Sequence, residues 1–137
     1  GEASGAAQPD RAWIKALLDG WGKPRYRERF LVKRGERLDY IPAGKVAYCY
    51  SAEGLTHLVA QDGQRDLLDR SLEDLVSELD PDHFFRASRK CIVALSAIAG
   101  IHKYFSGRLK LELKPSAPFD VLVSRERVED FQTWLDR

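Results

Sequence analysis

Residues 109–114 read LKLELK, a strict alternation of leucine with a charged residue. Successive side chains of a β-strand point to opposite faces, so this period of two predicts a strand over 109–113 with one buried and one solvated face. Shorter alternating or β-rich runs, separated by turn residues, occupy much of the remaining chain. They predict strands at 29–33, 37–41, 46–50, 55–60, 65–68, 91–95, 98–105 and 119–123.

Turn signals separate these runs and favour hairpins between them. The segments 33–36, 51–54, 61–64 and 106–107 each contain a glycine. The pair Asp62-Gly63 is a strong signal for a tight hairpin, because both residue types accept the backbone angles that such turns need. The predicted fold class is therefore mostly β, a β-rich α+β fold of about ten short strands in small sheets with short helices.

Helical signals occur at three places within residues 26–137. Ser71 is a typical N-cap with Asp74 three residues later, and Asp80-Pro81 ends the helix. Ser124 is expected to cap a C-terminal helix, and residues 82–87 are expected to form a short helical turn that presents two phenylalanines to the core. The apolar stripes expected to face inward are Leu72, Leu75, Val76 and Leu79 in the first helix, and Val128, Phe131, Trp134 and Leu135 in the second.

The first 25 residues have a different character and are interpreted as a linker segment, residues 1–25, ahead of one domain, residues 26–137. A chain of 137 residues fits a single domain. The linker is expected to hold a short helix capped by Asp10. Its apolar positions are Trp13, Ile14, Leu17 and Leu18, and Gly20, Gly22 and Pro24 would end it.

Charge is distributed unevenly, although the formal net charge is only +1. Residues 86–127 contain nine Lys and Arg against three acids, whereas the rest of the chain has a net charge of −5. Such polarity is typical of a protein with one face toward a polyanion, although chance clustering on solvated faces gives the same count.

The motifs of enzymes and metal sites are missing from the sequence. His57, His83 and His102 lie too far apart to define a metal site, and the acids fall on helix faces. Cys49 and Cys91 each lie in an apolar run and are expected to be reduced and buried. We therefore expect no catalysis, cofactor or metal, no membrane partner, and a cytoplasmic location.

Residues 84–90 (FFRASRK) combine two aromatic anchors with three cations just before a predicted strand. Arg suits bidentate hydrogen bonds to guanine, and Lys suits phosphate oxygens, so Arg86, Arg89 and Lys90 are candidate DNA contacts. For Arg86, an ion pair with Asp82 or Glu78 is an equal alternative.

Two further groups of candidate DNA-contacting residues lie at predicted helix starts. Ser124, Arg125 and Arg127 precede the C-terminal helix, where free N–H groups favour an anion and local cations are unfavourable unless an external anion binds. Arg70 and Ser71 begin the middle helix; a plain N-cap is the default role of Ser71, with phosphate binding possible in addition.

These same segments resemble the LytTR-type DNA-binding domain of bacterial two-component response regulators. The likeness rests on residues 71–75 (SLEDL), 84–93 (FFRASRKCIV) and 121–125 (VLVSR), and it extends over about residues 26–137. Two positions depart from the family pattern: Ala94 stands where asparagine is usual, and Glu126 stands where a basic residue is common.

The resemblance implies a double-stranded DNA reader that inserts loops into successive major grooves and often bends the duplex. It also implies paired sites upstream of promoters, a homodimer on DNA and an N-terminal receiver domain in the full-length protein. Family contact positions fall at 51–57, around Arg89 and Lys90, and at 124–127. In the first of these, Thr56 or its neighbour His57 is the expected base contact.

Two functions are consistent with these features. The first is sequence-specific DNA binding for transcriptional control. The second is a β-rich protein-interaction or ligand-binding regulatory module without DNA binding. The coincidence of the basic stretch with the family's contact loops favours the first.

Overall fold

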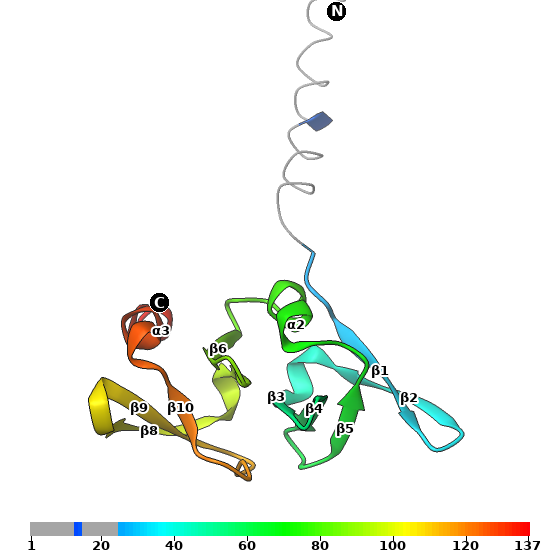
Figure 1. Cartoon of the computed structure of the whole chain (residues 1–137). Helices are drawn as coiled ribbons and strands as arrows, with labels where there is room; N and C mark the ends of the chain where they lie inside the picture. Colours follow the sequence, from blue (N-terminus) through cyan, green and yellow to red (C-terminus); the bar gives the residue numbers. More distant parts are fainter. Residues whose placement is uncertain (1–12, 15–24) are drawn as a thin grey trace, which may run out of the picture.

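The computed structural model describes residues 13–14 and 25–137. Within them, ten strands form three separate antiparallel sheets, as Figure 1 shows. The strands are β1 (Arg29–Arg34), β2 (Arg37–Pro42), β3 (Val46–Ala52), β4 (Leu55–Ala60), β5 (Arg65–Leu68), β6 (Phe84–Ser88), β7 (Cys91–Ala94), β8 (Ile98–Tyr104), β9 (Arg108–Leu113) and β10 (Val121–Val123). The helices are α2 (Leu72–Glu78) and α3 (Val128–Leu135), with 3₁₀ turns η1 (Ala43–Lys45), η2 (Leu95–Ala97), η3 (Phe105–Gly107) and η4 (Arg125–Arg127). The mostly β prediction is confirmed.

Strands β1 and β2 form a two-stranded ribbon at one end of the molecule (Figure 1). A turn of Gly35 and Glu36 joins them, and Gly35 has a φ of 66°, which glycine adopts without strain. The inner face of the ribbon buries Phe30, Val32 and Ile41. Its outer face leaves Leu31, Leu38 and Tyr40 exposed.

The central sheet has the strand order β5-β4-β3-β7-β6. Residues 46–50 of β3 are all buried because β3 lies between β4 and β7 and is covered on both faces. Helix α2 packs Leu72, Leu75 and Leu79 into the same core. Val76 was predicted to face inward with these leucines but is 44% exposed. It lies at the edge of the helix face that the three leucines form.

The predicted helical turn at 82–87 is wrong from Phe84 onward, where the chain forms the edge strand β6. Strand β7 provides the backbone partners that β6 needs. Alternation then sends the two phenylalanines to opposite sides: Phe84 enters the core of the central sheet, and Phe85 packs against Phe131 and Trp134 of α3, with ring centroids 5.2 and 5.3 Å away. One strand thus anchors two layers, which a helical turn would not do.

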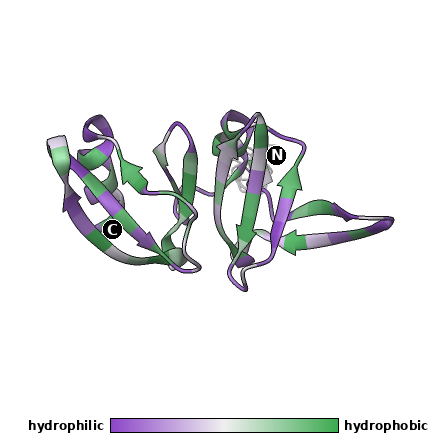
Figure 2. Cartoon of the chain, turned by 60° about the horizontal axis from the view of Figure 1, so that its bottom comes forward, coloured by the Kyte–Doolittle hydropathy of each residue, from purple (hydrophilic) through white to green (hydrophobic). Residues whose placement is uncertain are grey.

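Strands β8, β9 and β10 form the third sheet, in the order β10-β9-β8. Leu109, Leu111 and Leu113 are buried on one face, which confirms the prediction from the alternation. Figure 2 shows the bands of hydrophobic and hydrophilic residues along the strands. Helix α3 buries Phe131 and Trp134, and the indole Nε1 of Trp134 donates to the carbonyl of Pro81 at 2.6 Å.

Several smaller predictions also have outcomes. Cys49 and Cys91 are free and buried, as expected, and burial raises the pKa of the Cys91 thiol to about 12. The linker helix falls largely outside the described residues; Trp13 and Ile14, which are described, are exposed. In the part of the chain that the structure describes, no helix is both long and apolar enough to cross a membrane.

Candidate nucleic-acid interface

Arg86 closes the turn between β6 and β7. Its Nε donates to the carbonyl of Ser88 at 3.2 Å, and its Nη2 donates to the carbonyl of Arg89 at 3.0 Å. Nη1 forms an ion pair with Glu73 of α2. The alternative of an ion pair for Arg86 is therefore correct, but its partner is neither Asp82 nor Glu78. The Arg86 side chain is only 15% exposed. Its donors hold the turn in place and are directed into the protein.

Arg89 and Lys90 form the exposed tip of this turn. The backbone N–H of Lys90 is held by the Ser88 hydroxyl at 3.2 Å, and the carbonyl of Lys90 accepts from the N–H of Ser51 at 2.9 Å. Among the described residues, no carboxylate lies within ion-pair distance of either side chain. A rigid backbone therefore presents two cations to solvent without neutralising them.

Residues 124–127 lie beside the same turn. The N–H of Ser124 donates to the carbonyl of Ala87 at 3.4 Å, which joins β10 to β6. Ser124 occupies the N-cap position as predicted, but of the 3₁₀ turn η4 (Arg125–Arg127), which runs directly into α3 at Val128, and the Ser124 hydroxyl makes no capping hydrogen bond. The Ser124 carbonyl instead accepts from the N–H of Arg127 at 2.9 Å.

The two cationic segments share a surface pocket. Residues of α2, of the β6–β7 turn and of the segment after β10 line it. They are Glu73, Arg86, Ser88, Arg89, Ser124, Glu126 and Arg127. Arg125 does not line this pocket. Its side chain packs on the η3 turn so closely that a Cβ added to Gly107 would lie 3.0 Å from the Arg125 Cδ. Neither Arg125 nor Arg127 has an ion-pair partner within residues 25–137.

The β3–β4 hairpin approaches the same region through Ser51. Its two turn residues, Glu53 and Gly54, have positive φ angles of 54° and 75°, and they are exposed. Thr56, opposite Ser51 in the sheet, is only 8% exposed. The ring of His57 stacks on Tyr50 with centroids 4.6 Å apart and planes 4° from parallel, and its Nε2 is buried without a hydrogen-bond partner. The Thr56 side chain is therefore buried, and the half-buried His57 ring has its Nε2 inside the protein.

Arg70 and Ser71 form a separate group at the start of α2. Ser71 and Asp74 make a complete capping box, with hydrogen bonds of 3.1 and 3.2 Å, as predicted. Arg70 pairs with Glu78, whose other oxygen accepts from Arg27 at 3.1 Å. Arg70 therefore ties the chain entering β1 to the end of α2, away from the cationic pocket.

Sequence reasoning identified the cations of this surface but not the contacts that arrange them. It missed the ion pair of Glu73 with Arg86, the bond of Ser51 to Lys90, and the packing of Arg125 on Gly107. No sequence signal identifies these partners, because each joins segments far apart in the chain. Among the described residues, no three His, Cys, Asp or Glu side chains are grouped to hold a metal ion.

Comparison with known proteins gives concordant results. The family model for the LytTr DNA-binding domain matches residues 36–136. The transcriptional regulatory protein YpdB of Escherichia coli K12 is 29% identical over 99 residues, which are 72% of this chain and 40% of that protein; YpdB of Shigella flexneri matches equally. The chain thus spans less than half the length of these relatives. A solved structure described as the LytTr DNA-binding domain of a response regulator from Bacillus cereus matches with a TM-score of 0.71 and 22% identity, over 81% of this chain and 99% of that one.

Proposed function

Because the chain belongs to the LytTR DNA-binding domain family, we propose that it binds double-stranded DNA in a sequence-specific manner to control transcription. The observation that carries the proposal is the joining of two distant cationic segments at one surface. Arg89 with Lys90, and Arg125 with Arg127, come from different sheets, yet the Ser124–Ala87 hydrogen bond holds the two segments together. Four cations without acidic partners among the described residues suit the phosphates and base edges of a duplex.

The contacts divide the candidate residues into two roles in this proposal. Arg89, Lys90, Ser124, Arg125 and Arg127 contact DNA directly, with Arg89 the base reader, because an exposed guanidinium on a rigid turn can form bidentate bonds to guanine in the major groove. The remaining candidates act indirectly. Arg86, Arg70, Ser71, Thr56 and His57 hold the turns, the helix and the hairpin in position.

The wider context of the proposal is a two-component response regulator. The matched Bacillus cereus domain carries that description, and the Escherichia coli relative, named a transcriptional regulatory protein, is more than twice as long as the matched region. We propose that an N-terminal receiver domain precedes this domain, and that two copies bind paired sites upstream of a promoter. Each copy places the turns at 53–54, 89–90 and 125–127 in major grooves.

A second candidate function is protein interaction without DNA. The observation in its favour is the outer face of the β1–β2 ribbon, where Leu31, Leu38 and Tyr40 are each at least 60% exposed. Grouped apolar side chains on a surface are typical of interaction sites. The four cations of the β6–β7 turn and of residues 125–127 do not fit this function.

Selection of bound duplexes from a random pool tests the proposal, with the affinity of the selected duplexes measured across salt concentrations. DNA binding predicts enrichment of a short paired motif and a log–log salt slope of about −0.9 per phosphate contacted. An apolar partner surface would show no such slope. Failure to enrich any motif, with only weak and general binding to duplexes, would leave the protein-interaction function as the better account.

A further inference from the structure

The η3 turn between β8 and β9 presents an aromatic ring to solvent. Phe105 is 75% exposed, more than any other large hydrophobic residue in the described part of the chain. The ring of Tyr104 meets it edge-on, with centroids 5.0 Å apart. Exposing a phenylalanine to water gains nothing for folding, and the ring is free to contact a partner.

The turn holds the Phe105 ring outward on a fixed backbone. Ser106 and Gly107 both have positive φ angles, 62° and 74°, which reverse the chain within two residues. The Nε of Arg108 donates to the carbonyl of Phe105 at 2.9 Å, while its guanidinium lies over the Tyr104 ring at 5.1 Å. The side chain therefore projects from a braced hairpin tip, which lowers the entropy cost of inserting it into a partner.

The tip is continuous with the cationic surface, since the Arg125 side chain packs on Gly107. Three cations belong to this tip: Arg125 packs on Gly107, Arg108 follows the turn and lies over the Tyr104 ring, and the exposed Lys103 precedes Phe105 by two residues in β8. Acids also face this hairpin: Lys110 pairs with Asp120 at 3.3 Å and His102 contacts Glu112 at 3.3 Å. The remaining unpaired cations favour a polyanion over an apolar protein surface.

We propose that Phe105 is an apolar wedge that inserts into the bound duplex, partly unstacks one base step and bends the DNA. This inference rests on the proposed DNA binding. Phenylalanine is among the side chains that proteins insert between base steps, and the unstacking costs least at flexible pyrimidine–purine steps. Bending brings more duplex backbone toward Arg125, Arg108 and Lys103, and these contacts offset the deformation energy.

The test compares the unaltered chain, Phe105→Ala, Phe105→Leu and the control Leu38→Ala, an exposed apolar residue on the β1–β2 ribbon. A duplex selected by the unaltered chain carries end-attached fluorophores to measure bending and 2-aminopurine at successive positions to detect unstacking. Thermal midpoints confirm that each variant folds, as expected for changes at exposed positions.

If the proposal is right, one 2-aminopurine position brightens on binding, and Phe105→Ala abolishes this signal, reduces the bend and weakens affinity about tenfold or more. Phe105→Leu retains much of the bend, and Leu38→Ala changes nothing. Equal affinity and bending by Phe105→Ala and the unaltered chain would refute the wedge while leaving DNA binding intact. If the unaltered chain selects no duplex, DNA binding itself is refuted and the wedge with it.

Discussion

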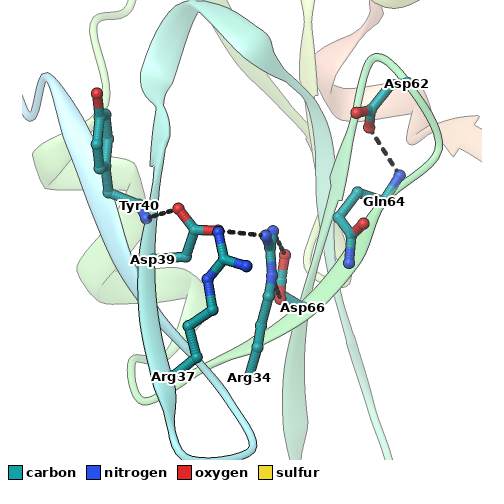
Figure 3. A network of polar contacts seen from close by, with 7 residues as sticks. All are labelled: Arg34, Arg37, Asp39, Tyr40, Asp62, Gln64 and Asp66. Atoms are coloured by element: carbon teal, nitrogen blue, oxygen red, sulfur yellow. Dashed lines mark hydrogen bonds and ion pairs between the residues drawn. The ribbon is translucent and has the colours of Figure 1, made fainter.

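Arginines in two regions of the molecule, the β1–β2 ribbon and the cationic surface, differ in their partners. In the β1–β2 ribbon, the guanidinium of Arg34 binds both oxygens of Asp66, at 3.1 and 3.0 Å, and one oxygen of Asp39, at 2.8 Å (Figure 3). The hydrogen bonds that Arg34 donates to the Asp66 carboxylate raise the pKa of the guanidinium. Arg89 and Arg125, at the cationic surface, have no acidic partner among the described residues.

The difference lies in where the acids are placed. An arginine with a neighbouring carboxylate, such as Arg34, stabilises the fold, whereas an exposed arginine without one, such as Arg89, is free to bind an external anion. Asp66 is 5% exposed and ties the ribbon to β5 at the edge of the central sheet. Two acids line the pocket beside Arg89: Glu73 is already paired with Arg86, and Glu126 makes no ion pair with Arg89. The protein thus satisfies its structural arginine and leaves its exposed arginines available to an external anion.

The largest expected effect breaks the sheet beneath the cationic surface. Leu111→Ala should lower the free energy of unfolding by about 2–5 kcal/mol, through lost burial and a cavity, because Leu111 is 3% exposed. Chemical denaturation measures this. Its cross-strand neighbour Ile101, 41% exposed, is the matched control, and Ile101→Ala should cost clearly less. Equal losses would show that the buried face of β9 is not the main support of this sheet.

The second effect comes from removing the ion pair between Arg34 and Asp66. Asp66→Ala removes the buried partner of Arg34, so the variant should lose stability, though less than Leu111→Ala, because Arg34 keeps Asp39 and access to water. DNA affinity of the folded variant should stay unchanged. Glu36→Ala, which removes an exposed acid in the β1–β2 turn, is the control. A loss of DNA affinity in Asp66→Ala would mean that the ribbon and the cationic surface are coupled.

The third effect comes from removing Arg89, an exposed arginine that we propose reads a base. Arg89→Ala should weaken binding to a selected site by about 1–3 kcal/mol and relax preference at one base pair, with no change in thermal midpoint. Arg37→Ala, another exposed arginine but on the ribbon, should leave DNA affinity unchanged. If Arg89→Ala weakens random and selected duplexes equally, Arg89 contacts a phosphate and another residue reads the base.

The sequence predicted those parts of the molecule that local chemistry determines. Alternation defined β9, glycine-containing turns defined the hairpins, and the Ser71 capping box defined the start of α2. The failures share a physical cause, which is dependence on partners distant in sequence. Residues 84–88 became a strand because β7 offered a free edge, and the bond of the Ser124 N–H to the distant Ala87 was not predictable from the local sequence.

The candidate site divides in the same way. Charge and motif identified Arg89, Lys90, Arg125 and Arg127, because exposed cations need no partner to be recognised. The burial of Thr56 could not be predicted from the sequence, because its neighbours in the sheet come from β3 and β5.

The smallest expected effect decides between two roles of Ser71. As an N-cap, its hydroxyl accepts the N–H of Asp74, so Ser71→Ala should cost about 1 kcal/mol of stability. Ser77→Ala, in the same helix, is the matched control. The decisive variant is Ser71→Asp, because aspartate caps as well as serine but adds a negative charge. Unchanged stability and unchanged DNA affinity would identify Ser71 as a cap alone, whereas unchanged stability with weakened affinity and an altered salt slope would place it against a phosphate and extend the cationic surface to α2.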